Sequence, residues 1–215
     1  MVIMKAKFGQ KYPALKDLIS FLLFVAAVVV GTWLLNSYVF RSYNVVGVSM
    51  ENTLHGGDRI IVNRLPVTGA HILEKEYIPE RGQIIVFANG GNEEKVNCRP
   101  LENVDDKYII KRVIAFPEER VVLKDGELKV YNDENPDGFN PDDETRKSDD
   151  DGPKSEITGE VDLVVPKGEI FVSGDNREGS NSYDSRNGLG IIPFCRIVGP
   201  AAIRIYPFNK IRFFN

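Results

Sequence analysis

Two residues of this sequence could together carry out nucleophilic attack with proton transfer: Lys111 as a base and Ser49 as a nucleophile. Lys111 lies in an apolar run, residues 108–116, whose β-branched composition is typical of a strand. Alternation along a strand puts Lys111 and Arg112 on opposite faces, so one of the two cations must point toward an apolar face. Burial lowers the pKa of an ammonium, and a neutral lysine is a usable general base. Taken alone, however, the run favours an edge strand with both cations in solvent.

The hydroxyl of Ser49 is the best candidate nucleophile. Ser49 follows the apolar stretch 45–48 and precedes a glycine-rich turn at residues 56–58. A serine hydroxyl is weak until a neighbouring base accepts its proton, and serine–lysine pairs are a known solution. Without such a base, a serine at the end of a strand is usually a turn residue.

A third group of polar residues lies in the segment 174–188, which has the composition of a loop. Among several short hydroxyl side chains it carries Asp175, Arg177, Asp184 and Arg186. Such a set can form a cross-bonded shell that fixes a neighbouring side chain. The alternative is a solvated polar turn.

The N-terminal part predicts a membrane anchor that positions the rest of the chain. Residues 18–40 form an uncharged run of 23 residues, which as a helix would measure about 34 Å and span a hydrocarbon core of ~30 Å. Four lysines precede it, which orients the N-terminus to the cytoplasm. A cleavable signal peptide is less favoured, because its apolar region is shorter. We therefore expect residues 1–16 in the cytoplasm, an anchor at 17–40, and an extracytoplasmic domain at 41–215.

The chain after the predicted anchor is expected to form β structure. Short β-branched runs bounded by turn residues predict an antiparallel domain, with strands at 43–48, 59–62, 83–87, 108–115, 120–123, 127–131, 161–165, 169–173 and 196–205. Asp125-Gly126 predicts a hairpin turn between two of them. Twelve acidic residues gather at about 131–162, which predicts a solvated acidic insert on the surface.

Composition excludes two classes of protein. Two cysteines are too few for a disulfide-framed miniprotein, and a net charge of −4 argues against nucleic acid as a partner. The sequence leaves open whether Cys98 and Cys195 form a disulfide. It also leaves open whether the spacing from Asp133 to Glu144, which matches a calcium-binding loop, holds a cation. We expect no cofactor and no catalytic metal.

In this setting the chain resembles the bacterial type I signal peptidases, membrane-bound serine proteases that remove signal peptides from exported proteins. Four blocks carry the resemblance in the family's order: 48–54 around the serine, 81–87, 108–117 around the lysine, and 174–186. The resemblance covers residue 18 to the C-terminus apart from the acidic insert. It implies a mostly β, antiparallel signal-peptidase-like domain behind one transmembrane helix. Its expected partners are signal peptides and membrane lipid.

The resemblance also implies a role for each matching residue. Ser49 would be the nucleophile, with its own backbone N–H holding the oxyanion, and Lys111 would be the general base. Ser182 would orient the lysine, and Met50 would shape the substrate pocket. Four further residues would brace the loop: Asp175, Asp184, Arg186 and Arg112.

Some alternatives stay open at this stage. The loop between Arg177 and Ser182 is two residues longer than is usual in the family, so Ser180 is a second candidate for the orienting hydroxyl. His55 or His71 could replace the lysine as base. A membrane-tethered module of the same fold that binds peptides without cutting them would need neither base.

Overall fold

The computed structural model describes residues 13–89, 107–145 and 156–214. Its contacts divide the chain into an N-terminal unit that ends at Val39 and a second unit that begins at Phe40.

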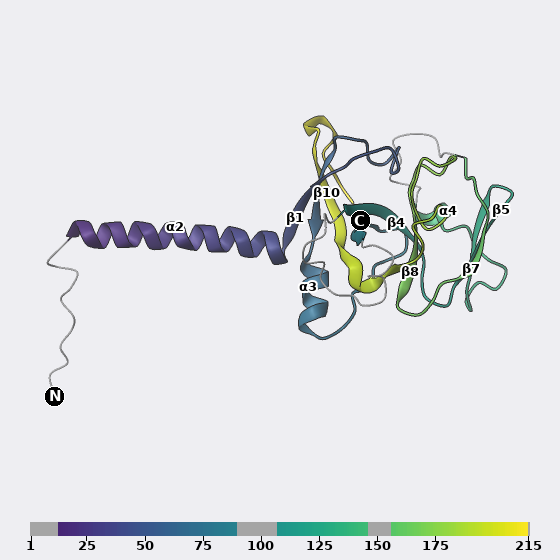
Figure 1. Ribbon diagram of the computed structural model, residues 1–215, viewed down its shortest axis with the longest axis horizontal. Helices are drawn as coiled ribbons and strands as arrows, with labels where there is room; N and C mark the ends of the chain where they lie inside the picture. The colour runs from purple at the N-terminus through teal and green to yellow at the C-terminus, as the bar shows by residue number, and fades with distance from the viewer. Residues whose placement is uncertain (1–12, 90–106, 146–155, 215) are drawn as a thin grey trace. The chain divides into compact units, whose positions relative to one another are not determined.

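The N-terminal unit is the helix α2, Pro13–Tyr38, of 26 residues (Figure 1). Its apolar side chains are exposed all round; Phe21, for example, is 62% exposed. The stretch Ala14–Tyr38 is long and apolar enough to cross a membrane. The helix begins a few residues before the predicted anchor and ends two residues short of it.

The second unit is mostly antiparallel sheet, which confirms the predicted fold class (Figure 1). Its larger sheet has the strand order β1-β2-β10-β3-β4-β8-β9, with β11 paired to β10. These strands are β1 Phe40–Asn44, β2 Arg59–Asn63, β3 Ile84–Asn89, β4 Lys107–Ala115, β8 Glu169–Ser173, β9 Ile192–Pro193, β10 Ile197–Tyr206 and β11 Arg212–Phe213. Two short 3-10 helices, η2 Phe194–Arg196 and η3 Phe208–Lys210, flank β10.

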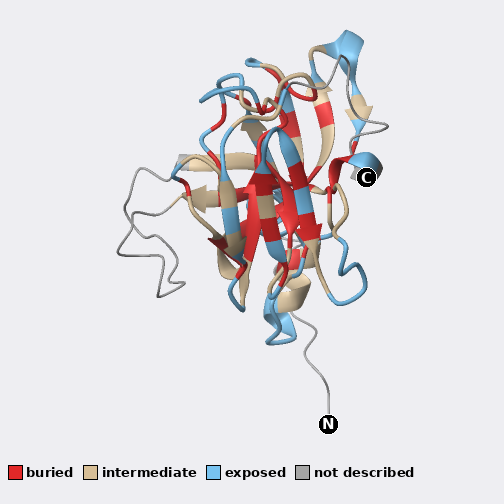
Figure 2. Cartoon of the chain, turned by 90° about the vertical axis from the view of Figure 1, so that its right-hand side faces the viewer, coloured by how far each residue is buried: buried red, intermediate tan, exposed pale blue. Residues whose placement is uncertain are grey.

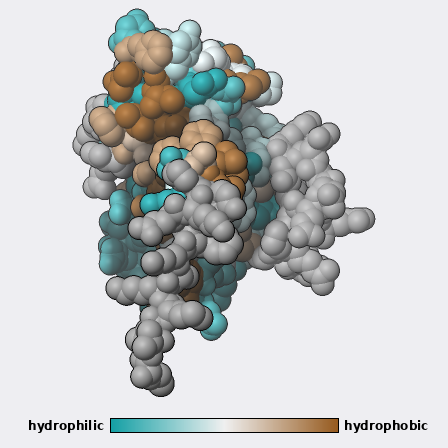
Figure 3. All heavy atoms as spheres, turned by 90° about the vertical axis from the view of Figure 1, so that its left-hand side faces the viewer, coloured by the Kyte–Doolittle hydropathy of each residue, from teal (hydrophilic) through white to brown (hydrophobic). Residues whose placement is uncertain are grey.

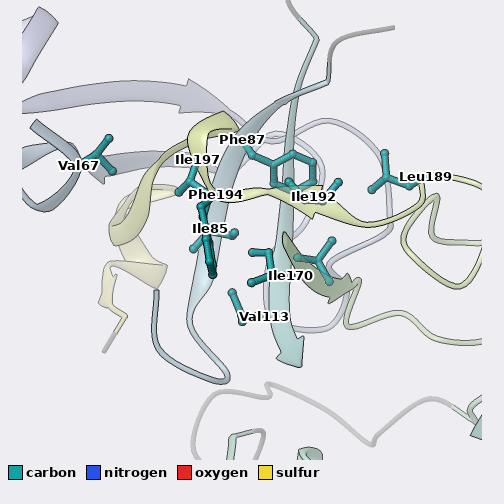
Figure 4. Packing of buried hydrophobic residues seen from close by; sticks show 10 residues of the cluster. Val67, Ile85, Phe87, Val113, Ile170, Leu189, Ile192, Phe194 and Ile197 are labelled. Carbon is teal, nitrogen blue, oxygen red and sulfur yellow. The ribbon is translucent and has the colours of Figure 1, made fainter. Parts of the chain in front are cut away.

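The central strands are buried on both faces, as the red strands at the centre of Figure 2 show. Ile85 and Phe87 of β3 pack into one cluster, with Val113 of β4 (Figure 4). Their neighbours Ile84 and Val86 pack into a second cluster on the other face. The continuous apolar run of β3 is therefore explained by a strand that packs against the core on both of its faces.

A smaller sheet carries the order β6-β5-β7. Its strands are β5 Arg120–Lys124, β6 Glu127–Tyr131 and β7 Val161–Val164. The predicted hairpin turn joins β5 to β6, and both Asp125 and Gly126 have positive φ, as a tight two-residue turn requires. A short helix, α4 Asp142–Thr145, lies in the acidic insert between β6 and β7.

The sequence patterns missed the helix α3, Leu65–Ile72. It has only eight residues and buries one side chain, Val67, so it shows no helical periodicity to detect.

Several aromatic side chains near the C-terminus stay exposed, including Phe208 and Phe213, whereas Phe214 is buried. Figure 3 shows hydrophobic residues gathered on the upper part of one face.

Candidate active site

Ser49 lies in the segment that connects β1 to β2. This segment is closed at its base by backbone hydrogen bonds between Val45 and Asp58 at 2.8 Å and between Gly57 and Val45 at 3.0 Å. The buried carboxylate of Asp58 also accepts a bond from Arg204 of β10 at 3.1 Å. The sheet thus holds both ends of the loop that presents Ser49.

Lys111 lies in the centre of the larger sheet, on β4 between β3 and β8. Lys111 and Arg112 are 3% and 1% exposed, so the interpretation that both cations are solvated on an edge strand is wrong. Lys111 Nζ lies 2.8 Å from Ser49 Oγ and donates to the carbonyl of Ile110 at 2.9 Å. The structure therefore brings together the two residues that the sequence singled out first.

The surroundings of Lys111 change its protonation. Burial lowers its pKa from 10.5 to about 8, although the carboxylates of Asp184 and Asp175 oppose the shift. With that pKa, roughly a tenth of the amine is neutral at pH 7, against about 0.03% for an ordinary lysine. The site can therefore supply an amine base close to neutral pH.

Arg112, on the opposite face of β4, anchors the strand to the loop after β8. Its Nε and Nη2 donate to the two carboxylate oxygens of Asp175 at 2.8 and 2.7 Å. Asp175 also accepts a bond from Thr53 Oγ1 at 2.6 Å, and all three side chains are buried. One carboxylate thus links the strand of the lysine with the loop of the serine.

Replacement of Asp175 by asparagine is expected to lower the free energy of unfolding by about 3–5 kcal/mol, because it leaves a buried guanidinium without its counter-charge. Urea unfolding in detergent, followed by near-UV circular dichroism, measures the change. Asp162→Asn is the matched control: Asp162 has the same two-point pairing, with Arg120, but in solvent. An equal loss in both variants would contradict a role for burial.

The loop after β8 packs directly on the backbone of the nucleophile. Asn176 N donates to the carbonyl of Ser49 at 3.1 Å, and Asn176 Nδ2 donates to the carbonyl of Val48 at 3.2 Å. A Cβ on Gly174 would collide with the carbonyl oxygen of Ser49 and the hydroxyl of Ser182. A side chain at Gly174 would therefore push the loop away from the serine.

Asp184 and Arg186 close the same loop. Arg186 donates to both carboxylate oxygens of Asp184, from Nε at 3.1 Å and from Nη2 at 2.8 Å. Burial alone would raise the pKa of Asp184, but these bonds hold it below its usual range. Asp184 also accepts bonds from Gly174 N at 2.9 Å and Ser173 Oγ at 3.1 Å. The charged side chains of this segment therefore form a cross-bonded shell, while residues 178–181 are exposed.

The two serine candidates for orienting the lysine differ in their surroundings. Ser182 is fully buried, and its hydroxyl lies beside the carboxylate of Asp184, whose pKa it helps to lower. Ser180 is exposed. The orienting role of Ser182 stays a prediction.

A cavity of about 470 Å³ lies in front of Ser49 and Lys111. Its walls come from the segment 43–48, from β4 and from the loop after β8, where they include Ser180, Asn181 and Tyr183. Met50 is buried in the core cluster that also contains Ile60 and Val86, two residues of the cavity wall. Its effect on the pocket stays a prediction.

A larger cavity, of about 620 Å³, shares the segment 44–47 with the first. Its other walls are residues 56–57, Arg59 and the end of β10 with Phe208. Since Ser49 and Lys111 are not among the described residues that line it, the smaller cavity is the one associated with the chemistry.

The remaining candidates fall outside the site. Among the described residues lining the cavity at Ser49, neither histidine is present: His55 lies in the connecting loop and His71 is exposed at the end of α3. The described parts of the chain contain no group of three or more His, Cys, Asp or Glu side chains placed to hold a metal. Cys195 is disulfide-bonded, and Cys98 lies outside the described residues.

Two features of this region were missed by sequence reasoning. One is the buried pair of Arg204 and Asp58, whose partners are 146 positions apart in the chain. The other is Asp142, a buried residue of the acidic insert that pairs with Arg177. Neither had a signal in the sequence, because Asp142 stands in a run of acidic residues and Arg204 in an ordinary strand.

Comparison with known proteins identifies the family. The model of the family "signal peptidase, peptidase S26" matches residues 15–206. Signal peptidase I T of Bacillus subtilis (strain 168) is 35% identical over 182 residues, which cover 83% of this chain and 80% of the relative. Signal peptidase I of Bacillus licheniformis is 33% identical over 187 residues, which cover 86% of each chain.

A solved signal peptidase I from Enterococcus faecalis V583 is 24% identical, covers 57% of this chain and 96% of its own, and superposes with a TM-score of 0.36. The fold assignment therefore rests on the strands of this chain, and the family assignment rests on its sequence. The chain belongs to the signal peptidase family, peptidase S26, as a member of the type I signal peptidases, which are serine proteases.

Proposed function

We propose that this chain is a membrane-anchored endopeptidase that removes N-terminal signal peptides from exported proteins, with Ser49 as nucleophile and Lys111 as general base. The observation that carries the proposal is the 2.8 Å contact between Ser49 Oγ and the Nζ of a buried lysine. Burial lowers the pKa of the Lys111 amine to about 8, and a perturbed amine beside a hydroxyl favours a role in proton transfer. Membership of the family supports signal-peptide removal as the reaction.

The geometry is suited to acyl transfer in two steps. Neutral Lys111 takes the proton of Ser49 as Oγ attacks the scissile carbonyl, and the backbone N–H of Ser49 stabilises the oxyanion. The Lys111 ammonium then returns the proton to the leaving amine, and an acyl-enzyme remains. Lys111 next activates a water, which attacks the ester and releases the signal peptide.

An extended peptide fits the edges that border the cavity. β1 is an outer strand of the sheet, and within the described strands β8 pairs with β4 only from Arg112 onward. Residues 108–111 of β4 therefore lie beside the cavity opposite the segment 43–48. A peptide could add between the two edges, and the family implies small side chains at its −1 and −3 positions.

The proposed topology places the N-terminus in the cytoplasm and the second unit outside. The helix α2 would span the bilayer, with Trp33 and Tyr38 near its outer end. The exposed aromatic residues Phe208 and Phe213 favour membrane lipid as a further partner. The domain boundaries at 16, 40 and about 131–162 stay part of this proposal.

The test is cleavage of a fluorogenic signal-peptide substrate by the full chain in detergent micelles, with Ser49→Ala as the control. We expect turnover by the unmodified chain and none above background in the variant. Binding of the substrate without any turnover would indicate instead the peptide-binding module.

The rate is expected to depend on pH through Lys111. Because only the neutral amine accepts a proton, kcat/KM should rise with pH and level off above the lysine pKa of about 8. At pH 6 it should be roughly 100-fold below the plateau. A substrate without titratable groups between pH 5 and 9 gives the measurement, and a flat profile from pH 6 to 9 would contradict the assignment.

A further inference from the structure

One carboxylate of the acidic insert is withdrawn from solvent. Asp142, the first residue of α4, is 2% exposed. It accepts two bonds from the buried guanidinium of Arg177, one from Nη1 and one from Nη2 at 2.7 Å. Such two-point pairing is among the strongest geometries that arginine and carboxylate form. The insert therefore supplies a buried ion pair, contrary to the expectation that it is only a solvated excursion.

The arginine of this pair belongs to the loop that supports the nucleophile. Arg177 Nε donates to the carbonyl of Gly174 at 3.1 Å. Gly174 is the residue that has no room for a side chain between the backbone of Ser49 and the hydroxyl of Ser182. Contacts thus run without a break from Asp142 through Arg177 and Gly174 to the serine.

The other end of the insert holds the same loop. Thr158 donates to the carbonyl of Arg177 from its backbone N at 3.2 Å and from Oγ1 at 3.3 Å. Arg186 Nη1 donates to that carbonyl as well, at 3.0 Å. The position of Arg177 is therefore shared with Arg186, whose guanidinium pairs with Asp184 beside the lysine.

We propose that Asp142 is a positioning residue for the catalytic pair: it holds Arg177, and through it the loop 174–186, against Ser49 and Lys111. This inference rests on the proposed function, because it assigns a role toward the same dyad. The physical reason is that an arginine cannot lose its proton. Without the carboxylate of Asp142 the buried guanidinium loses this two-point partner, and the Nε that donates to Gly174 is no longer held from that side.

The variant Asp142→Asn tests this in the full chain, with the fluorogenic signal-peptide substrate. We expect kcat to fall at least about 30-fold and KM to rise by only about threefold, because this loop supplies one part of the cavity wall, with Ser180, Asn181 and Tyr183, and the segment 43–48 and β4 supply the rest. Asp143→Asn is the matched control, because Asp143 is the adjacent carboxylate and is exposed. It should stay within about twofold of the unmodified chain in both constants.

A pH profile separates positioning from lost stability. Lys111 faces the carboxylates of Asp184 and Asp175, the guanidinium of Arg186 and the hydroxyl of Ser49. A displaced loop admits water to the amine, which raises the pKa of Lys111. The midpoint of the rise of kcat/KM with pH should therefore move to higher pH by at least about half a unit. A variant that is merely less folded would scale the profile and leave its midpoint in place.

Arg177→Lys is the second variant, in case Asp142→Asn folds poorly. It keeps a cation against Asp142 but loses the planar fork that also bonds Gly174, so kcat should fall about tenfold with the same direction of pH shift. If the unmodified chain cleaves the substrate and both variants keep its kcat and the midpoint of its pH profile, this inference is wrong and the proposed function still stands. Equal losses in Asp142→Asn and Asp143→Asn would overturn it too. Absence of turnover in the unmodified chain would instead overturn the proposed function.

Discussion

Replacement of Ser49 by alanine is expected to lower kcat/KM for signal-peptide cleavage by at least about 10⁴-fold, because the hydroxyl supplies the attacking atom. The fold should be preserved, since the change removes one oxygen at a partly exposed position. Substrate affinity should change little for the same reason. Initial rates across substrate concentrations, with direct binding measured by fluorescence anisotropy, give both quantities.

The control for this experiment is Ser42→Ala, an exposed serine of β1. It should cleave at the rate of the unmodified chain. Mass spectrometry of an acid-quenched reaction should detect a peptidyl adduct on the unmodified chain and none on the Ser49 variant. Substantial turnover by Ser49→Ala would show that another group attacks the substrate.

Replacement of Lys111 by methionine is expected to abolish cleavage to a similar extent and yet to stabilise the fold. Activity is lost because no other described basic group contacts Ser49 Oγ. Stability should rise because methionine fills a similar volume without an ammonium to desolvate. The shift from 10.5 to about 8 corresponds to a gain of up to about 3 kcal/mol, reduced by the lost hydrogen bonds.

The sign of this effect depends on pH. The pKa of Lys111 is lower in the folded state than in the unfolded state, so below pH 8 the native state carries the full cost of the charged amine. Between pH 8 and 10.5 the unfolded state binds more protons, and the native state gains stability as pH rises. The advantage of Lys111→Met should therefore be largest below pH 8 and fade toward pH 10.5. Urea unfolding at pH 7 and 10 tests this, and a loss of stability at pH 7 would contradict the desolvation of Lys111.

Local pattern was enough to predict most strands of the second unit. The strand around residues 108–115 and the hairpin at Asp125-Gly126 follow from composition and turn chemistry, and both are present. Periodicity also placed Lys111 and Arg112 on opposite faces. It could not tell that both faces are covered, because that depends on which strands lie beside β4, and β8 is more than fifty residues further along the chain.

The catalytic pair and its supports were predictable to different degrees. Ser49 and Lys111 came from residue type and from the resemblance, but their 2.8 Å contact is a product of the tertiary fold. Asp142 was hidden in a run of acidic residues: it is 2% exposed, whereas its neighbour Asp143 is exposed. A buried carboxylate differs from a solvated one only through its partner, and Arg177 lies 35 positions away.

The most direct test of the account is the pKa of Lys111 itself. Lysine labelled with ¹³C next to Nζ can be titrated by NMR in the full chain, and the Lys111 signal is assigned by its absence from Lys111→Met. The expected midpoint is about 8, together with loss of signal-peptide cleavage below it. A midpoint near 10.5, the value of a solvated lysine, would contradict it.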